Sequence, residues 1–208
     1  MQKPIICFEG PSGIGKTTLC NILSNQFNIV PEVNLLFQRT GSESKYWYHE
    51  RQIERYELCK KSTSSSILDG DIFQPIWYNW VCKYPLEFLS KEETHRFYYE
   101  NLMQGKIRFP DLYVVFFVDE KELWIRKERD TTRRRRNFKK HLEIIEPLKK
   151  YYRFLDQDTE IEMRFVHYSD IESAKKSVLS LIQSLKQKSI IDEIKVFRQI
   201  ENWISRNS

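Results

Sequence analysis

The chain has 208 residues, of which 40% are hydrophobic and 30% are charged, and its formal net charge is +5. This length and composition suit one globular α/β domain and exclude a disordered, fibrous or disulfide-stabilised protein. No apolar run is long enough to cross a bilayer, and the first strand is expected almost at the amino terminus, so neither a membrane span nor a signal peptide is expected. The four cysteines form no Cys-x-x-Cys pair, which favours reduced thiols in a cytoplasmic protein over a disulfide framework or a metal site.

Residues 10–17 match the pattern Gly-x-x-x-x-Gly-Lys-[Ser/Thr] in full. The apolar run 4–8 precedes them and apolar residues at helical spacing follow, so the local order is strand, glycine-rich turn and helix. In this context backbone N–H groups and the helix N-terminus converge on a triphosphate, Lys16 neutralises the β- and γ-phosphates, and the Thr17 hydroxyl binds Mg²⁺. The sequence therefore predicts a site for a nucleoside triphosphate, expected to be ATP, with Mg²⁺. The residues expected to hold the nucleotide are Gly10, Pro11, Ser12, Gly13, Ile14, Gly15, Lys16, Thr17 and Thr18.

The rest of the chain alternates apolar strand-like runs with helical patterns, which is typical of a parallel sheet with helices on both faces. Helices are expected at residues 16–26, 45–60, 72–81, 91–104, 120–129, 138–156 and 170–188. Further strands are expected at residues 28–30, 66–68, 112–118 and 163–168. Ser90 and Glu93 form a capping box ahead of the fourth helix, and Pro147 is expected to kink or divide the sixth.

The last segment, residues 190–204, repeats isoleucine and phenylalanine at helical spacing and so forms one apolar face. We expect it to pack on the domain or on a second copy of the chain, which would make a homodimer. The expected organisation is one P-loop domain at residues 1–188, with an arginine-rich segment at about 129–137, followed by an amphipathic helix at 189–208.

Carboxylates follow the second and third strands, in Pro31-Glu32-Val33 and Asp69-Gly70-Asp71. Phosphoryl transfer asks a protein mainly for positioning and charge stabilisation. Asp69 is assigned to hold Mg²⁺ through a bound water, with a polar residue that merely ends a strand as the alternative. Glu32 can accept the proton of an attacking hydroxyl, with Asp71 as a substitute base and an ordinary surface glutamate as the alternative.

Arginines are concentrated at Arg126, Arg129 and positions 133–136, between two expected helices and ahead of the last strand. This position favours a lid that closes over the triphosphate, in which Arg129 and one or two of the block, such as Arg133, reach the transferred phosphoryl group. A solvated or nucleic-acid-binding basic patch and a targeting signal are the other interpretations.

Aromatic side chains crowd the two helical stretches that follow the second and third strands, namely Tyr46, Trp47, Tyr48, Phe73, Trp77 and Tyr78. In this architecture such stretches line a pocket beyond the carboxyl ends of the strands, and flat walls suit a nucleobase or another ring. Core packing is the alternative for each aromatic residue taken singly. The candidates for contact with an acceptor substrate are Glu32, Tyr46, Trp47, Asp71, Phe73 and Trp77.

With these features the chain resembles the thymidylate kinase and deoxynucleoside kinase group of P-loop phosphotransferases, over its length to about Lys188. Phe8-Glu9-Gly10 looks like the start of thymidylate kinases, Pro31-Glu32-Val33 is similar to the Glu-bearing segment of deoxynucleoside kinases, and the arginine-rich segment looks like their lid. The resemblance implies a three-layer P-loop NTPase fold with a five-stranded parallel sheet, helices on both faces and an arginine-rich lid. It also implies an ATP- and Mg²⁺-dependent kinase.

One position departs from that group, because Gly70 stands where the group has an arginine. The dianionic phosphate of a nucleoside monophosphate needs bidentate arginine, and Arg39, Arg51, Arg55 and Arg96 are not at the expected place. The expected reaction is therefore transfer of the γ-phosphate to a hydroxyl of a small molecule, in the first place a nucleoside, with a phosphate acceptor left open. The alternatives are a nucleic-acid end kinase or RNA-binding ATPase, a non-enzymatic nucleotide switch, and an O-phosphotransferase acting on antibiotics or other small molecules. Nucleic acid is not the expected partner.

Overall fold

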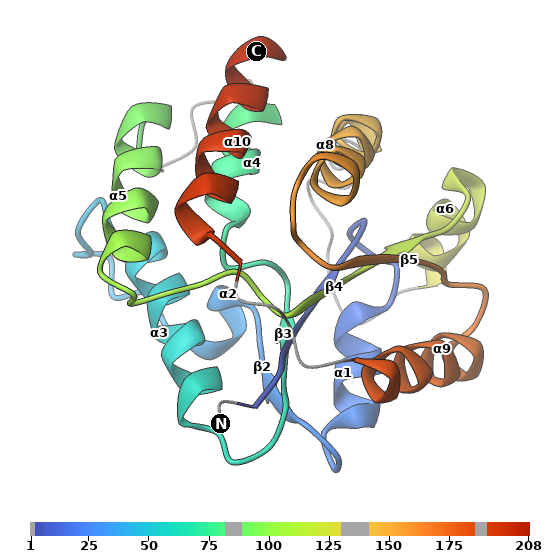
Figure 1. Ribbon diagram of the computed structural model, residues 1–208. Helices are drawn as coiled ribbons and strands as arrows, with labels where there is room; N and C mark the ends of the chain where they lie inside the picture. The colour runs from blue at the N-terminus through green and yellow to red at the C-terminus, as the bar shows by residue number, and fades with distance from the viewer. Residues whose placement is uncertain (1–2, 82–88, 130–141, 186–190) are drawn as a thin grey trace.

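The computed structural model describes residues 3–81, 89–129, 142–185 and 191–208. In these residues five strands form one parallel sheet with the order β2-β3-β1-β4-β5, and helices cover both of its faces (Figure 1). The expected α/β fold with a five-stranded parallel sheet is confirmed. The strands are β1 (Ile5–Glu9), β2 (Asn28–Val30), β3 (Ser66–Asp69), β4 (Leu112–Phe117) and β5 (Met163–His167).

The helices divide between the two faces of the sheet. α1 and α9 pack on one face together with Leu123 of α6, and α3, α4, α5, α8 and α10 pack on the other. No helix in the described ranges is long and apolar enough to span a membrane. The bounds are α1 (Lys16–Leu23), α2 (Val33–Leu36), α3 (Trp47–Lys61), α4 (Gln74–Val81), α5 (Lys91–Met103), α6 (Glu120–Arg129), α8 (Ile145–Asp158), α9 (Ile171–Ser184) and α10 (Glu193–Arg206).

Strand β1 lies in the middle of the sheet and is buried on both faces. Ile5 and Cys7 belong to the apolar cluster under α3, α4 and α8, whereas Ile6 and Phe8 belong to the cluster under α1 and α9. An apolar run with side chains alternating between two covered faces is what a central parallel strand requires. Because parallel strands end at the same edge, the segments that follow β1, β2 and β3 meet there (Figure 1).

Some element boundaries differ from the sequence-based expectation. α1 ends at Leu23, three residues before the expected end, and α2 is a four-residue helix that no periodicity indicated. α8 begins at Ile145, so Pro147 falls in its first turn, where a missing N–H removes no helical hydrogen bond. The expected interruption is therefore at Ile144, ahead of the proline, and residues 138–141 of the expected helix lie outside the described ranges.

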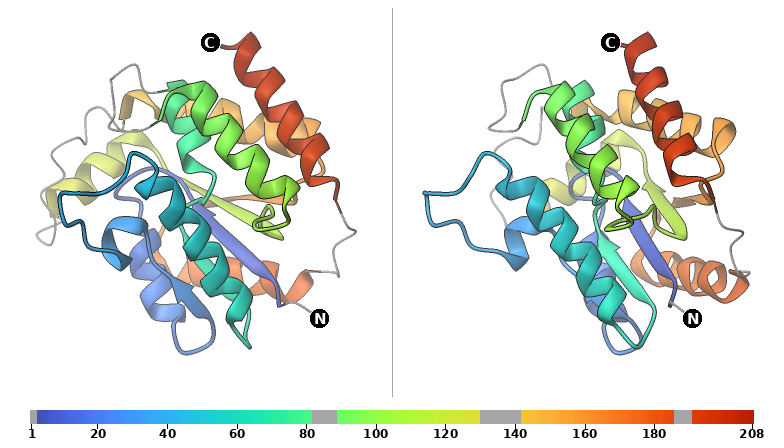
Figure 2. Two further views of the ribbon diagram at one scale, coloured as in Figure 1. Left: turned by 90° about the vertical axis from the view of Figure 1, so that its left-hand side faces the viewer. Right: turned by 60° about the vertical axis from the view of Figure 1, so that its left-hand side comes forward.

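The last helix, α10, lies beside α5 in both views of Figure 2. Its apolar residues Val196, Phe197, Ile200 and Ile204 are all buried within the chain. Polar contacts add to this packing, since Trp80 of α4 donates its indole N–H to the carbonyl oxygen of Asn207 at 3.0 Å. α10 is thus attached to α4, one of the helices that reach the cavity described next.

Candidate active site

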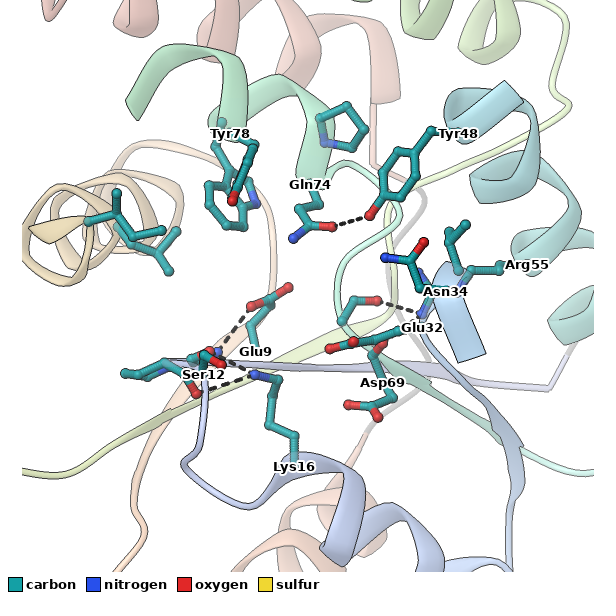
Figure 3. A pocket seen from close by; sticks show the side chains of 18 of the residues that line it. Glu9, Ser12, Lys16, Glu32, Asn34, Tyr48, Arg55, Asp69, Gln74 and Tyr78 are labelled. Atoms are coloured by element: carbon teal, nitrogen blue, oxygen red, sulfur yellow. Dashed lines mark hydrogen bonds between the residues drawn. The ribbon is translucent and has the colours of Figure 1, made fainter. Parts of the chain in front are cut away.

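A cavity of about 350 Å³ lies at the edge of the sheet where β1, β2 and β3 end (Figure 3). Its walls come from the glycine-rich loop, the start of α2, the end of β3, and the helices α3, α4 and α8. Segments far apart in the sequence meet here because the parallel strands deliver their following loops to one edge. Figure 3 shows Glu9, Lys16, Glu32 and Asp69 around the same space.

The glycine-rich loop forms one end of the cavity, through Gly10, Pro11, Ser12 and Lys16. Gly10 has φ +136°, and an added Cβ would lie 2.5 Å from the carbonyl oxygen of Phe116, so only glycine fits. The Lys16 ammonium group donates hydrogen bonds to the carbonyl oxygens of Gly10 at 2.8 Å and Pro11 at 3.5 Å. The loop is therefore curled around the lysine, as phosphate binding requires.

The start of α1 also depends on close packing. Gly15 precedes the helix with φ +115°, and an added Cβ would lie 2.7 Å from the Tyr168 hydroxyl. Glycine is the residue that adopts this backbone conformation without strain. The first turn of α1 can then present its N–H groups toward the cavity side of the loop.

Thr17 and Asp69 meet beside this loop although they are 52 positions apart in the sequence. The Thr17 hydroxyl donates to Asp69 Oδ2 at 2.7 Å, because β1 and β3 pair with Phe8 opposite Asp69. Asp69 is buried, and its Oδ1 atom has no hydrogen-bond partner among the described residues. A hydroxyl and a carboxylate with an unused oxygen form a donor set of the kind that Mg²⁺ prefers, so these residues fit that ion.

Glu9 is a site residue that the sequence analysis used only as a family marker. It ends β1, lines the cavity and is almost fully buried. Its two carboxylate oxygens accept from the backbone N–H groups of Gly10 at 3.0 Å and Asp71 at 2.7 Å. Burial raises its pKa above the ordinary glutamate value. Glu9 therefore joins the glycine-rich loop to the turn after β3.

The part of the cavity away from the glycine-rich loop is lined by Glu32, Trp77 and Tyr78. Tyr48, one of the expected aromatic residues, and Gln74, which the sequence analysis did not single out, also line it. The Tyr48 hydroxyl donates to Gln74 Oε1 at 2.7 Å, which fixes the orientation of the Gln74 side-chain amide. This end thus combines flat aromatic walls, an oriented amide and one carboxylate.

Tyr46 and Trp47 do not line the cavity, although the sequence analysis proposed them as acceptor contacts. Tyr46 stacks on Phe97, and the Arg39 guanidinium lies over the Trp47 ring at 4.8 Å. The reason is helix phase, since Tyr48 and Arg55 are seven residues apart on α3 and so share the face that meets the cavity. A seven-residue spacing was the signal that could have found this face.

Asp71 and Phe73 also lie behind the cavity wall. The Phe73 ring stacks on Phe109 with centroids 4.2 Å apart and is completely buried. Asp71 Oδ1 accepts from the Tyr113 hydroxyl at 3.0 Å and from the Phe73 backbone N–H at 3.0 Å. The turn after β3 directs both side chains into the core, which is why neither lines the cavity.

Structural comparison finds this architecture in solved kinases. Thymidylate kinase from Candida albicans is similar with a TM-score of 0.56 and 16% sequence identity, over 88% of this chain and 92% of that one. Deoxyadenosine kinase from M. mycoides with bound dATP gives a TM-score of 0.57 and 16% identity, over 86% and 100% of the two chains. The chain has a P-loop nucleoside/nucleotide kinase-like fold.

A second structure of the M. mycoides kinase, with the products dCMP and a flexible dCDP bound, gives a TM-score of 0.57 and 13% identity, over 86% of this chain and 99% of that one. Neither the family models nor the curated protein sequences give a match. At these identities the likeness is one of fold, and the chemistry has to be argued from the residues of the cavity.

Arg126 of α6 connects the glycine-rich loop to the segment that follows β5. Its guanidinium donates to the carbonyl oxygen of Ile14 at 2.9 Å and to those of Tyr168 at 2.7 Å and Ser169 at 2.9 Å. Arg129 ends α6, but its side chain, like the arginines at 133–136 including Arg133, lies outside the described part of the chain. The arginine-rich lid therefore stays a prediction.

Asp71→Asn is expected to stabilise the protein increasingly as the pH rises. Burial, and next the Glu9 carboxylate, raise the pKa of Asp71 from an ordinary value of 3.8 to about 7. An acidic group whose pKa is raised by folding stabilises the folded protein fully at a pH below the pKa it has in the unfolded chain. This stabilisation is lost as the pH rises through the pKa that the group has in the folded protein. The asparagine cannot ionise but keeps the acceptor oxygen for Tyr113, so its advantage over the parent should grow by about 3 kcal/mol between pH 5 and pH 8. Urea unfolding at several pH values measures this, and parallel pH profiles for both proteins would show that Asp71 does not titrate in this range.

Proposed function

We propose that this protein is a phosphotransferase that moves the γ-phosphate of ATP to a hydroxyl group of a small molecule, with a nucleoside as the best-supported acceptor. The observation that carries the proposal is that one cavity joins the glycine-rich loop and Lys16 at one end to Glu32 and an aromatic wall at the other. Donor and acceptor would thus meet in one cavity, which is what direct phosphoryl transfer needs.

At the donor end, the loop and the first turn of α1 bind the triphosphate. Lys16 already lies inside the curled loop, held by two carbonyl oxygens that the phosphates would replace with stronger, charge-assisted partners. Thr17 and Asp69 would hold Mg²⁺, which would supply positive charge to offset the negative charge of the triphosphate. The contact between the two side chains supports this role.

At the acceptor end, Glu32 is the carboxylate that can take the proton from the attacking hydroxyl. It lines the cavity together with Asp69 and Gly70. An added Cβ at Gly70 would lie 3.7 Å from Glu32 Cγ, so the glycine leaves the space beside the glutamate open for a substrate. As the hydroxyl oxygen bonds to phosphorus, its proton passes to Glu32 and the bond to the leaving ADP oxygen breaks.

Arg39 also lines the cavity, with its guanidinium over the Trp47 ring, but the other polar groups at this end favour an acceptor without a phosphate. Tyr48 and Gln74 form a neutral hydrogen-bonded pair, and the Arg55 guanidinium is engaged by backbone carbonyl oxygens of Asp69 and Gly70. A planar, neutral ring with hydrogen-bonding edges suits Trp77, Tyr78 and the oriented amide. A nucleoside has these properties, and the structurally similar M. mycoides enzyme is a deoxyadenosine kinase.

A transfer screen tests the proposal. The purified chain, with radiolabelled ATP and Mg²⁺, is offered nucleosides, nucleoside monophosphates, hydroxylated antibiotics and 5′-hydroxyl oligonucleotides. Label is expected on nucleosides, with no signal from a Lys16→Ala protein. Preferred transfer to oligonucleotides would indicate a nucleic-acid end kinase, and transfer to antibiotics another small-molecule O-phosphotransferase. Tight ATP binding without transfer to any acceptor would overturn the enzyme assignment in favour of a nucleotide switch.

A further inference from the structure

Arg55 is a completely buried cation at the floor of the cavity, 1% exposed and carried by α3. Burying a guanidinium group is costly unless its N–H groups find acceptors. Here Nη1 donates to Gln52 Oε1 at 2.7 Å, and Nη2 faces backbone carbonyl oxygens rather than a carboxylate. A buried arginine that binds main chain in this way holds particular segments in place.

Those segments are the ends of two neighbouring strands. Nη2 of Arg55 donates to the carbonyl oxygens of Asp69 at 2.8 Å and Gly70 at 2.9 Å, and the carbonyl oxygen of Val30 lies 3.5 Å from the same nitrogen, a longer and weaker contact. Val30 is the last residue of β2, and Asp69 is the last residue of β3. Figure 3 shows the guanidinium beside Glu32 and Asp69. One side chain therefore connects both strand ends at the cavity.

This connection lies where the pairing of β2 with β3 stops. The pairing of β2 with β3 ends at Val30 opposite Leu68, so no further ladder contact between these two strands fixes the chain after Val30, whereas Asp69 is still paired with Phe8 of β1. Glu32 comes two residues after that point and Asp69 one residue after it. The spacing between the two carboxylates thus depends on what bridges the strand ends beyond the ladder, and Arg55 is bonded at that place.

We propose that Arg55 is a positioning residue that sets the spacing between the metal-binding carboxylate Asp69 and the base Glu32. This inference rests on the proposed phosphotransferase function. A guanidinium can serve several carbonyl oxygens at once because its donors are rigidly forked, whereas a lysine ammonium is a compact point charge on a flexible stem. The arginine therefore does more than add positive charge, and lysine cannot replace it.

The test compares Arg55→Lys with Arg51→Lys, a matched control one helical turn earlier on α3. Arg51 pairs with Glu54 at 2.5 Å and does not line the cavity. Arg55→Lys is expected to lower kcat roughly 10²-fold, the cost of a misplacement of about 1 Å, while the KM for ATP changes only a few-fold. The Mg²⁺ concentration for half-maximal rate should rise roughly tenfold, as is typical when a residue that orients a metal ligand is changed. Arg51→Lys should match the parent in kcat, in the KM for ATP and in the Mg²⁺ concentration for half-maximal rate.

A second measurement separates the inference from the proposed function. Binding of a fluorescent, non-hydrolysable ATP analogue is titrated with Mg²⁺, which needs no turnover, and the Mg²⁺ requirement should again rise for Arg55→Lys alone. If the parent transfers no phosphate but this shift is seen, the phosphotransferase proposal fails while the positioning of Asp69 by Arg55 stands. An unchanged Mg²⁺ requirement and kcat, or a loss of rate that only follows the loss of folded protein, would overturn the inference. If Arg55→Lys does not fold, Arg55→Gln, which keeps an N–H donor without burying a charge, is measured in its place.

Discussion

Lys16→Ala is expected to lower kcat for phosphoryl transfer at least about 10³-fold, because it removes the one cavity-lining lysine of the glycine-rich loop. Charge on the β- and γ-phosphates is stabilised almost entirely by positioned cations and amides, and single cationic contacts of this kind are worth roughly 10³-fold or more. The fold should survive, since among the described residues the hydrogen bonds of Lys16 Nζ go to the loop carbonyl oxygens of Gly10 and Pro11 and not to the core. Initial rates at saturating ATP and acceptor measure the effect.

The matched control for this variant is Lys60→Ala. Lys60 lies in the last turn of α3, where it forms an exposed ion pair with Glu57 at 3.4 Å, and surface pairs of this kind contribute little. The control should keep the parental rate and the parental Tm. If Lys16→Ala keeps a rate near that of Lys60→Ala, the glycine-rich loop is not the donor site, and the proposed function is wrong at its starting point.

Glu32→Gln is expected to lower kcat roughly 10²- to 10⁴-fold while the affinity for ATP stays nearly constant. Glutamine keeps the shape and hydrogen bonding of the side chain but cannot accept a proton near neutral pH, and general-base assistance contributes about this much. The donor is held at the other end of the cavity, so a residue that acts only on the acceptor hydroxyl should show its loss in kcat. Single-turnover rates, which isolate the chemical step, make the measurement.

Asp69→Asn and Glu57→Gln complete the comparison. If Asp69 supports Mg²⁺, the defect of its variant should ease as the Mg²⁺ concentration is raised, whereas the defect of Glu32→Gln should not. Glu57 is a surface glutamate paired with Lys60, so its variant should be indistinguishable from the parent. A Glu32→Gln enzyme within a few-fold of the parental rate would mean that another group takes the proton. Glu9 would then be the next carboxylate to change, because it lines the cavity and Asp71 does not.

The sequence by itself determined the features that depend on neighbouring residues. The glycine-rich loop is recognisable because three of its glycines adopt positive φ values that other residues rarely take. The Ser90–Glu93 capping box is present as expected, since both of its hydrogen bonds join residues within one helical turn. The buried central strands were equally clear, because their continuous apolar runs fit a sheet covered on both faces. The fold class follows from these local signals and their order.

The tertiary structure decided which of the candidate side chains share the cavity. The contact between Thr17 and Asp69 depends on the register of β1 against β3, and no spacing in the sequence encodes that register. Similarly, Tyr48 rather than Tyr46 or Trp47 reaches the cavity, because the start of α3 fixes the direction of each side chain, and one residue changes that direction by about 100°. The sequence pattern could identify a helix rich in aromatic residues, but not which of its side chains face the cavity.

The tertiary structure also determined the surroundings of the buried charged residues. Arg55 reads in the sequence as one basic residue among several on a polar helix, and only the packed structure places it against the ends of β2 and β3. In the sequence Glu9 and Asp71 are two ordinary acidic residues. In the fold the backbone N–H of Asp71 donates a hydrogen bond to the Glu9 carboxylate. Burial and long-range hydrogen bonds set the chemistry of such groups, and both arise only when segments distant in the chain are brought to one edge of the sheet.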